Sequence, residues 1–211
     1  MKVELLNIFG DDIMVCEAAR VSYSKEASNY TEEQNNKLIK YLANHNHWSP
    51  FSHPKVQFRL TMPIYVERQI IKTQAGVEYN SVSGRYVDFS DTYTTIDTWR
   101  KQSTDSKQGS EGKVSGQPIC KLIEGKVIET CKQAYQNLID LGVSKEQART
   151  ILPLNLNTTQ IWTGSFYSFI RLCKQRLKPD AQQETRELVQ MMLDQVKEKG
   201  SFKYSLEAFE L

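Results

Sequence analysis

Residues 67–86 read ERQIIKTQAGVEYNSVSGRY, and the expected organisation of the chain is built around this stretch. Its polar donors, glycines and guanidinium groups are too dense for an ordinary buried element, because each buried polar group needs a partner. At its end, Ser83, Gly84 and Arg85 offer a hydroxyl, unobstructed backbone N–H groups and a planar guanidinium, which together suit phosphate oxygens. The alternative interpretation is a solvated turn that precedes a strand starting at Tyr86.

Composition bounds the kind of protein. The 211 residues, with a formal net charge of +2, fit a single domain spanning residues 1–211. Acidic and basic residues are interspersed, which argues against a nucleic-acid partner and favours a small ligand. The four cysteines show no Cys-x-x-Cys spacing, Met1 is followed by charge, and no apolar run approaches the ~20 residues that span a bilayer. We therefore expect a reduced, cytoplasmic protein without a membrane partner.

The first half of the chain predicts two strands and two helices. A strand is expected over residues 3–9, a short helix over 13–20, and a helix after the Thr31-to-Gln34 capping box that continues to Asn44. From Lys55 to Met62 the apolar residues alternate with polar ones, as in a half-buried strand.

The second half predicts mainly helices. The segment from Gln102 to Gln117 is polar and glycine-rich, which favours a mobile loop. Helices are expected over residues 119–141, 145–151, 162–177 and 181–199, with a short strand over 154–157.

Several chemistries lack their motifs. The three histidines, between His45 and His53, have no helical His-x-x-x-His pair and no nearby cysteine, so we expect no metal site. Cys120 has no neighbouring histidine to activate it. Phosphate-loop and dinucleotide-binding glycine patterns are absent from the sequence. Scattered arginines, Arg85, Arg149 and Arg176, remain; they suit a phosphate or a polar heterocycle, although each alone is more often a surface residue.

A series of short motifs in one order gives a resemblance. The matching pieces are Ala19-Arg20-Val21-Ser22-Tyr23, Leu38-Ile39-x-Tyr41-Leu42, His47-x-Ser49-Pro50-Phe51-x-His53, Pro63-Ile64-Tyr65-Val66-x-Arg68-Gln69, Asn80-x-x-Ser83-Gly84-Arg85-Tyr86, Ala148-Arg149-x-x-Leu152-Pro153, and Arg176 with Ala181-Gln182-x-Glu184. The chain thereby resembles the flavin-dependent (ThyX-type) thymidylate synthases over nearly its whole length. The resemblance implies an α/β (α+β) fold with a twisted, mainly antiparallel sheet flanked by long helices. It also implies a homotetramer with active sites between subunits.

The resemblance also implies roles for individual positions. The pyrimidine deoxynucleoside monophosphate would be held by Gln69, Ser81, Ser83, Gly84, Arg85, Arg149 and Arg176, with Ser83 and Arg176 as catalytic residues. The cofactor side would comprise Ser22, His47, Ser49, Lys72, Thr73, Gln74, Asn80 and Arg171. In this family no cysteine acts as nucleophile: FAD, NADPH and 5,10-methylenetetrahydrofolate convert dUMP to dTMP.

The chain departs from the family pattern at two places in the sequence and in one spacing. Lys72-Thr73-Gln74 stands where family members carry Arg-His-Arg, and Ser81 stands where they carry a glutamate; the segment from Lys72 to Asn80 is also one residue longer. A hydroxyl in place of a carboxylate beside the base can alter the choice between uracil and cytosine, because cytosine presents an N4 donor. Alternatives to thymidylate synthesis are therefore a hydroxymethylase acting on dCMP or dUMP, and a catalytically silent nucleotide-binding relative.

Overall fold

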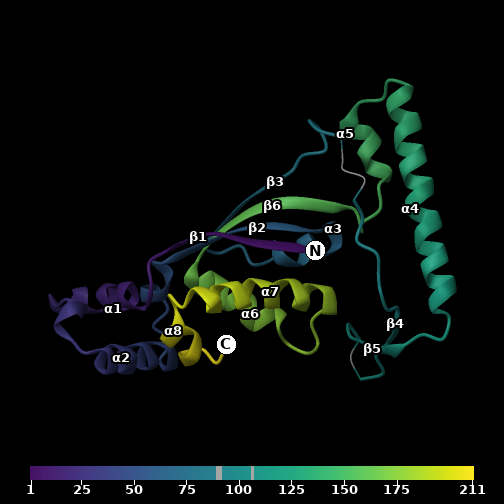
Figure 1. Cartoon of the computed structure of the whole chain (residues 1–211). Coiled ribbons are helices and arrows are strands. Elements are labelled where there is room, and N and C mark those ends of the chain that lie inside the picture. Colours follow the sequence, from purple (N-terminus) through teal and green to yellow (C-terminus); the bar gives the residue numbers. More distant parts are fainter. Residues whose placement is uncertain (89–91, 106) are drawn as a thin grey trace.

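A four-stranded antiparallel sheet forms the centre of the computed structural model, which describes residues 1–88, 92–105 and 107–211. Its strand order is β1 (Lys2–Phe9), β2 (Lys55–Pro63), β6 (Asn157–Ser165) and β3 (Val77–Ser81), and every pairing is antiparallel (Figure 1). The predicted alternation in β2 is confirmed, since Val56, Phe58, Leu60 and Met62 are fully buried. Burying these side chains on one face is what fixes the register of the sheet.

Helices α6 (Phe166–Arg176) and α7 (Gln183–Lys199) lie against one face of this sheet (Figure 1). The core between the layers is aromatic: the ring of Phe58 lies 6.1 Å from that of Trp162 and 5.8 Å from that of Phe169. The other face carries polar pairs, such as the hydroxyls of Thr61 and Thr159, which lie 3.0 Å apart. The sheet is therefore half-buried, as its alternating pattern requires.

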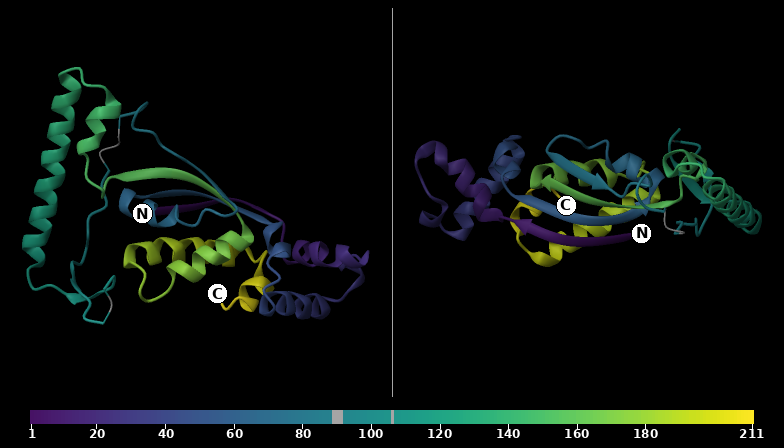
Figure 2. Two further views of the ribbon diagram at one scale, coloured as in Figure 1. Left: turned by 180° about the vertical axis from the view of Figure 1, so that it is seen from behind. Right: turned by 90° about the horizontal axis from the view of Figure 1, so that it is seen from above.

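One end of the sheet carries a small helical lobe (Figures 1 and 2). The lobe comprises α1 (Asp12–Arg20), the 3₁₀ turns η1 (Val21–Tyr23) and η2 (Ala27–Asn29), α2 (Glu32–Asn44) and α8 (Lys203–Ala208). The turn η3 (Ser49–Ser52) leads from the lobe toward β2. The capping box is present: the Thr31 hydroxyl accepts from the Gln34 amide, and the Gln34 side chain accepts from the Thr31 amide.

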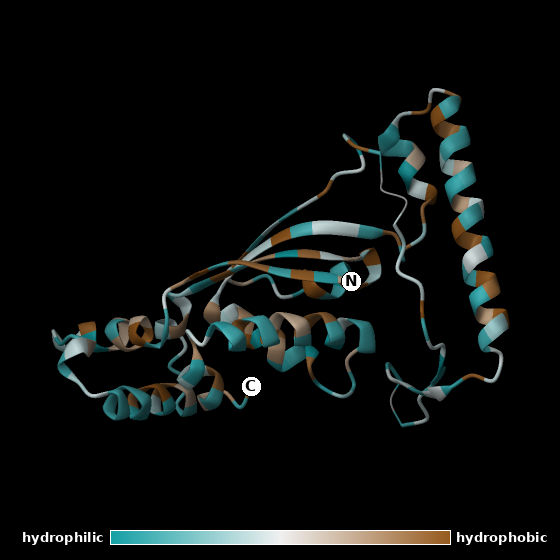
Figure 3. Cartoon of the chain, viewed as in Figure 1, coloured by the Kyte–Doolittle hydropathy of each residue, from teal (hydrophilic) through white to brown (hydrophobic). Residues whose placement is uncertain are grey.

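The opposite end carries elements that stand away from the sheet (Figures 1 and 2). They are the hairpin of β4 (Arg100–Gln102) and β5 (Ser110–Lys113), the helix α4 (Gln117–Asp140), the short α5 (Lys145–Ala148) and the turn η4 (Arg149–Ile151). Hydrophobic positions recur along α4 (Figure 3). The apolar side chains Ile119, Leu122, Ile123 and Val127 of this helix are 47% to 63% exposed. Their spacing marks one apolar face of a helix that the single chain leaves uncovered.

The structure corrects three expected boundaries. No strand begins at Tyr86, which lies in a turn; the strand of this region, β3, comes before the Ser83–Arg85 turn. The strand expected at 154–157 does not form: residues 154 and 155 lie in a turn, Leu156 makes an isolated bridge, and the nine-residue β6 begins only at Asn157. The helix expected from Trp162 begins only at Phe166, because residues 162–165 belong to β6. The reason is chemical: β6 buries Thr158 and Gln160 alongside Trp162, so its inward face is not apolar in sequence.

The polar segment from Gln102 to Gln117 contains β5 and the start of α4 rather than irregular structure alone. Its movement remains a prediction. In the described parts of the chain, no helix has both the length and the apolarity to cross a bilayer.

Candidate functional site

A polar cavity of about 420 Å³ lies where α3 (Ile64–Ile70) meets the C-terminal end of α6. Gln69 on α3 and Arg176 in the last turn of α6 line it, with Gln182 and the hairpin residue Gln108 at its border. Gln108 also donates a 3.1 Å hydrogen bond to Asp180. The β4–β5 hairpin therefore forms one wall of this cavity.

Arg176 is fixed at the edge of the cavity. One guanidinium nitrogen, Nη2, donates to the backbone carbonyl of Gln69 at 2.7 Å. The Nε atom of the same side chain is buried with no hydrogen-bond partner among the described residues. The Gln69 side chain donates in turn to that of Gln182. A cation held in this way keeps donor capacity available, which suits an electron-rich polar ligand.

A largely buried ion pair extends the same network. Arg100 Nη2 lies 2.6 Å from Glu184 Oε1, and Gln182 donates to the other carboxylate oxygen at 2.9 Å. Burial alone would raise the pKa of Glu184, but hydrogen bonds from Arg100, the backbone and Gln182 outweigh it and hold the pKa below its usual value. The ion pair ties the hairpin to α7 beside the cavity.

Neither partner of this ion pair is among the site residues that the sequence predicts. Glu184 belongs to the Ala181-Gln182-x-Glu184 motif that follows Arg176, which is a usable signal. Arg100 has no comparable signal, because it lies in a separate, polar part of the chain.

The turn from Lys72 to Gly76 crosses α6 between this cavity and a second one. Thr73 is 2% exposed and its hydroxyl donates to Gln175 at 3.3 Å, whereas Lys72 and Gln74 are exposed. At the other end, the Ser168 hydroxyl donates to the Ala75 carbonyl at 2.6 Å. Thr73 thus performs a structural task on α6, and its buried side chain leaves Lys72 and Gln74 as the accessible members of the predicted cofactor segment.

Position 76 requires glycine, because its backbone has a positive φ and passes close to the Ser168 side chain. Its φ is +73°, and a Cβ there would lie 2.6 Å from the Ser168 hydroxyl oxygen. The backbone therefore passes directly over the first turns of α6.

The second cavity, of about 570 Å³, lies on the far side of this turn. Arg171 and Lys55 supply positive charge to it, Trp48 supplies an exposed aromatic ring, and Gly76 supplies bare backbone. Aromatic and cationic groups around a cavity suit a ligand with an aromatic ring and phosphates. Of the predicted cofactor residues, Arg171 lines this cavity directly.

The remaining predicted cofactor residues lie around or beyond it. His47 and Ser49 flank Trp48 and are both exposed, and the His47 ring lies 5.9 Å from that of Tyr41. Ser22 lies in the turn η1 of the helical lobe, where it is exposed. Asn80 is exposed on β3 opposite Ile161, on the face of the sheet away from α6.

The nucleotide-side residues on β3 and beyond form a separate group. Ser81 donates a 2.8 Å hydrogen bond to Glu67 on α3. Ser83 and Arg85 contact each other through the Ser83 hydroxyl, and Arg85 also donates to the Tyr86 hydroxyl at 3.2 Å. Gly84 is buried between them.

Arg149 lies in η4, directly after α5. An ion pair of 2.9 Å between Asp88 and Lys145 ties the segment after Arg85 to α5. Figure 1 shows α5 and α6 on different sides of the sheet. The cavity beside Arg176 includes neither Arg85 nor Arg149 among its described lining residues, so the single chain does not bring the three arginines together.

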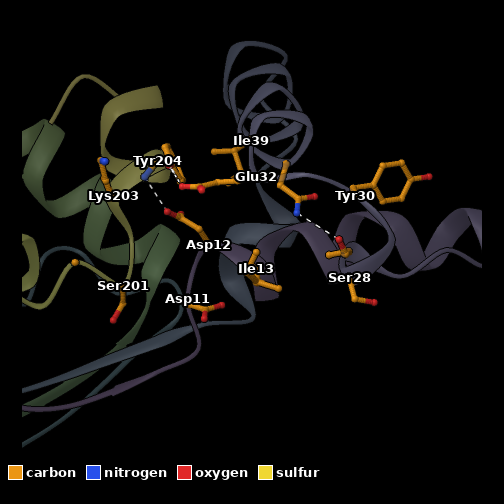
Figure 4. Close-up of a pocket in the computed structure, with 13 residues that line it drawn as sticks. Asp11, Asp12, Ile13, Ser28, Tyr30, Glu32, Ile39, Ser201, Lys203 and Tyr204 are labelled. Carbon is orange, nitrogen blue, oxygen red and sulfur yellow. Dashed lines mark hydrogen bonds between the residues drawn. The ribbon is translucent and has the colours of Figure 1, made fainter.

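A larger cavity, of about 710 Å³, lies in the helical lobe, and none of the predicted site residues lines it (Figure 4). Its carboxylates already have structural partners: Asp12 accepts from the Tyr204 and Ser205 amides at the start of α8, and Glu32 accepts from the Tyr204 hydroxyl. Burial raises the pKa of Asp12, although these hydrogen bonds oppose it. This cavity is therefore a feature of lobe packing.

Two of the four cysteines, Cys16 and Cys173, are buried. Burial raises the pKa of the Cys16 thiol to about 11, and it raises the pKa of the buried Cys173 as well. A protonated, buried thiol is a poor nucleophile. Within the same residues there is no group of three or more His, Cys, Asp or Glu side chains that could hold a metal ion.

The chain has an α+β fold, and two cavities with cationic side chains in their linings lie on the two sides of the Lys72–Gly76 turn. Comparison with known proteins gives the family. The sequence profile described as "Thymidylate synthase complementing protein" matches residues 4–200. The chain therefore belongs to this family, as its motifs predicted.

Individual relatives agree with this assignment. The flavin-dependent thymidylate synthase of Thermus thermophilus is 35% identical over 197 residues, which cover 93% of this chain and 72% of that protein. The enzyme of the same name from Kosmotoga olearia is 35% identical over 189 residues, covering 88% and 80%. The crystal structure of the UMP/dUMP methylase PolB from Streptomyces cacaoi superposes with a TM-score of 0.88 at 24% identity, over 99% of this chain and 94% of that one. This last likeness supports the fold alone.

Proposed function

We propose that this protein is a flavin-dependent thymidylate synthase, which transfers a one-carbon unit from methylenetetrahydrofolate to C5 of dUMP and completes the methyl group by reduction. The observation that carries the proposal is the 35% identity to enzymes of that name over 93% of the chain. FAD, NADPH and methylenetetrahydrofolate are the cofactors that this activity requires.

Arg176 and Gln69 are proposed to face the pyrimidine. The guanidinium is anchored on the Gln69 carbonyl, and its buried Nε has no partner in the described chain. A fixed cation beside the ring favours the electron density that develops at C5 when a carbon unit is attached. The Ser83–Gly84–Arg85 turn, with its hydroxyl, backbone N–H groups and guanidinium, is proposed to hold the phosphate.

The cavity beside Arg171 fits the flavin. Trp48 offers a ring for stacking, Arg171 and Lys55 offer cations for phosphates, and Gly76 leaves the backbone accessible. Lys72 and Gln74, on the turn that leads to Gly76, and His47 and Ser49, which flank Trp48, are proposed to contact it as well. When bound, FAD supplies the reducing equivalent for the methyl group after NADPH has reduced it. The residues of the chain bind and orient the ligands and limit the access of water.

We further propose that the active site is completed by a second subunit in a homotetramer. Two observations support this. First, Ser83, Gly84 and Arg85 do not line the cavity beside Arg176 in the described chain. Second, α4 exposes an apolar face formed by Ile119, Leu122, Ile123 and Val127. An uncovered apolar helix face of this kind is typical of subunit contacts. In the assembly, Arg85 and Arg149 of one subunit would approach Arg176 of another.

The activity is tested by release of tritium from C5 of labelled dUMP. We expect release that depends on methylenetetrahydrofolate and dTMP formation that also depends on FAD and NADPH. Binding of dUMP without release under any cofactor condition would favour the silent relative. Release without a methylated product would favour the hydroxymethylase.

A further inference from the structure

Ser81 lies in a short polar chain that crosses from β6 through β3 to α3. Gln160 Nε2 on β6 donates to the Ser81 hydroxyl oxygen at 3.2 Å, and that hydroxyl donates to Glu67 Oε1 at 2.8 Å. Ser81 is paired with Gln160 across the sheet, so both side chains lie on the face toward α3. The carboxylate of Glu67 is therefore held at the end of β3, two residues before the Ser83–Arg85 turn.

The direction of these hydrogen bonds is fixed by chemistry. An ionised carboxylate only accepts, so the single hydroxyl hydrogen of Ser81 must point to Glu67. The Ser81 oxygen must then accept from the amide nitrogen of Gln160. This orientation leaves the side-chain oxygen of Gln160, Oε1, without a partner among the described residues, although Gln160 is only 1% exposed. These two hydrogen bonds thus fix the orientation of the Ser81 hydroxyl, whose hydrogen points to Glu67.

Glu67 retains acceptor capacity after this contact. Within the described residues its bonded oxygen is Oε1, which receives Ser81, and the side chain is only half-buried. The carboxylate is thus positioned by Ser81 but can still accept a hydrogen bond from a ligand.

We propose that Glu67 is a binding residue of the nucleotide site, where its carboxylate accepts a hydrogen bond from an N–H or O–H group of the nucleoside. The inference rests on the proposed function. Family members carry a glutamate at the position of Ser81, on the strand that corresponds to β3. In this protein Glu67 would supply the carboxylate from α3 instead. The phosphate is excluded as the partner, because two anions in contact repel each other.

The first test compares nucleotide binding by calorimetry in the full protein loaded with FAD. Glu67→Gln is expected to weaken dUMP binding about tenfold, because a hydrogen bond to a charged acceptor is lost. It should leave binding of inorganic phosphate unchanged. Glu78→Gln, an exposed position on β3, is the matched control and should bind dUMP like the wild type.

The second test exchanges the two positions. Ser81→Glu should also weaken dUMP binding, because it sets a second carboxylate against Glu67. The double variant Glu67→Ala with Ser81→Glu should recover most of the affinity, since one carboxylate then remains at this place. A double variant that binds dUMP no more tightly than Ser81→Glu alone would overturn the proposal. Melting temperatures close to that of the wild type would show that the single variants are folded.

A third comparison, with 2-deoxyribose 5-phosphate, identifies the donor. If Glu67→Gln weakens this ligand as much as dUMP, the donor is the sugar hydroxyl; if it does not, the donor is the base. Equal dUMP affinity in Glu67→Gln and wild type would refute the role of Glu67 while leaving the proposed function intact. A wild-type protein that binds no pyrimidine nucleotide would refute both.

Discussion

The ion pair between Arg100 and Glu184 provides a quantitative test of the network beside the candidate site. Both side chains are mostly buried, with 19% and 10% exposure, and their atoms lie 2.6 Å apart. Arg100→Ala removes one partner and leaves the carboxylate in a poorly solvated place, which costs about 3 kcal/mol in pairs of this kind. For a domain of this length, that loss corresponds to a fall in melting temperature of about 6–12 °C.

The pH dependence separates this mechanism from a general packing defect. The pKa of Glu184 is lowered in the folded protein, so the pair stabilises the fold above the unfolded pKa of about 4.5 and loses that contribution as pH falls through the lower, folded value. Removing Arg100 takes away its hydrogen bond and its charge, which both lower the pKa of Glu184, so the pKa of this carboxyl is expected to be higher in the variant than in the wild type. The stability difference between wild type and Arg100→Ala should therefore shrink as pH falls below about 4.5.

The assay is urea denaturation of both proteins between pH 3.5 and 8, with Lys101→Ala, an exposed neighbour, as the control. We expect Lys101→Ala to change the free energy of unfolding by less than about 0.5 kcal/mol. A loss below about 1 kcal/mol in Arg100→Ala at neutral pH, or a loss that does not vary with pH, would refute the reasoning.

Three further predictions follow from the same contacts. Arg176→Ala should weaken dUMP binding about tenfold or more and lower turnover, measured by calorimetry and steady-state kinetics; unchanged constants would remove Arg176 from the site. Gly76→Ala should lower the free energy of unfolding by about 1–2 kcal/mol, because φ is +73° and the new Cβ would approach the Ser168 hydroxyl; Gly125→Ala, on an open helix face, should not be destabilising, and equal melting temperatures for the two would contradict this. Ile123→Glu should shift sedimentation toward smaller species without unfolding the chain, and an unchanged profile would exclude this face of α4 as a subunit contact.

The parts of the fold that follow periodic apolar patterns were predictable from sequence. The alternation in β2 and the capping box before α2 are local signals, and both are present in the structure. The strand β6 was missed because its buried face includes Thr158 and Gln160, so that burial and hydrophobicity do not coincide there. In α4 the apolar residues are regularly spaced but mostly not buried. Tyr135 is the one buried residue of this helix in the single chain.

The candidate site was predictable only in part. The sequence motifs marked Gln69 and Arg176, and the structure brings these two into contact. They could not show that Thr73 is buried against α6, because that contact depends on how the turn crosses the helix. The Ser81–Glu67 contact was equally invisible, since it joins residues 14 positions apart on different elements.

The central claim is that this chain methylates a uracil nucleotide, and product analysis tests it most directly. Purified protein with FAD, NADPH and methylenetetrahydrofolate is offered dUMP and dCMP separately, and the products are identified by mass spectrometry. The account predicts dTMP from dUMP and no product from dCMP. A 5-hydroxymethyl nucleotide from either substrate, or no product from dUMP, would contradict it.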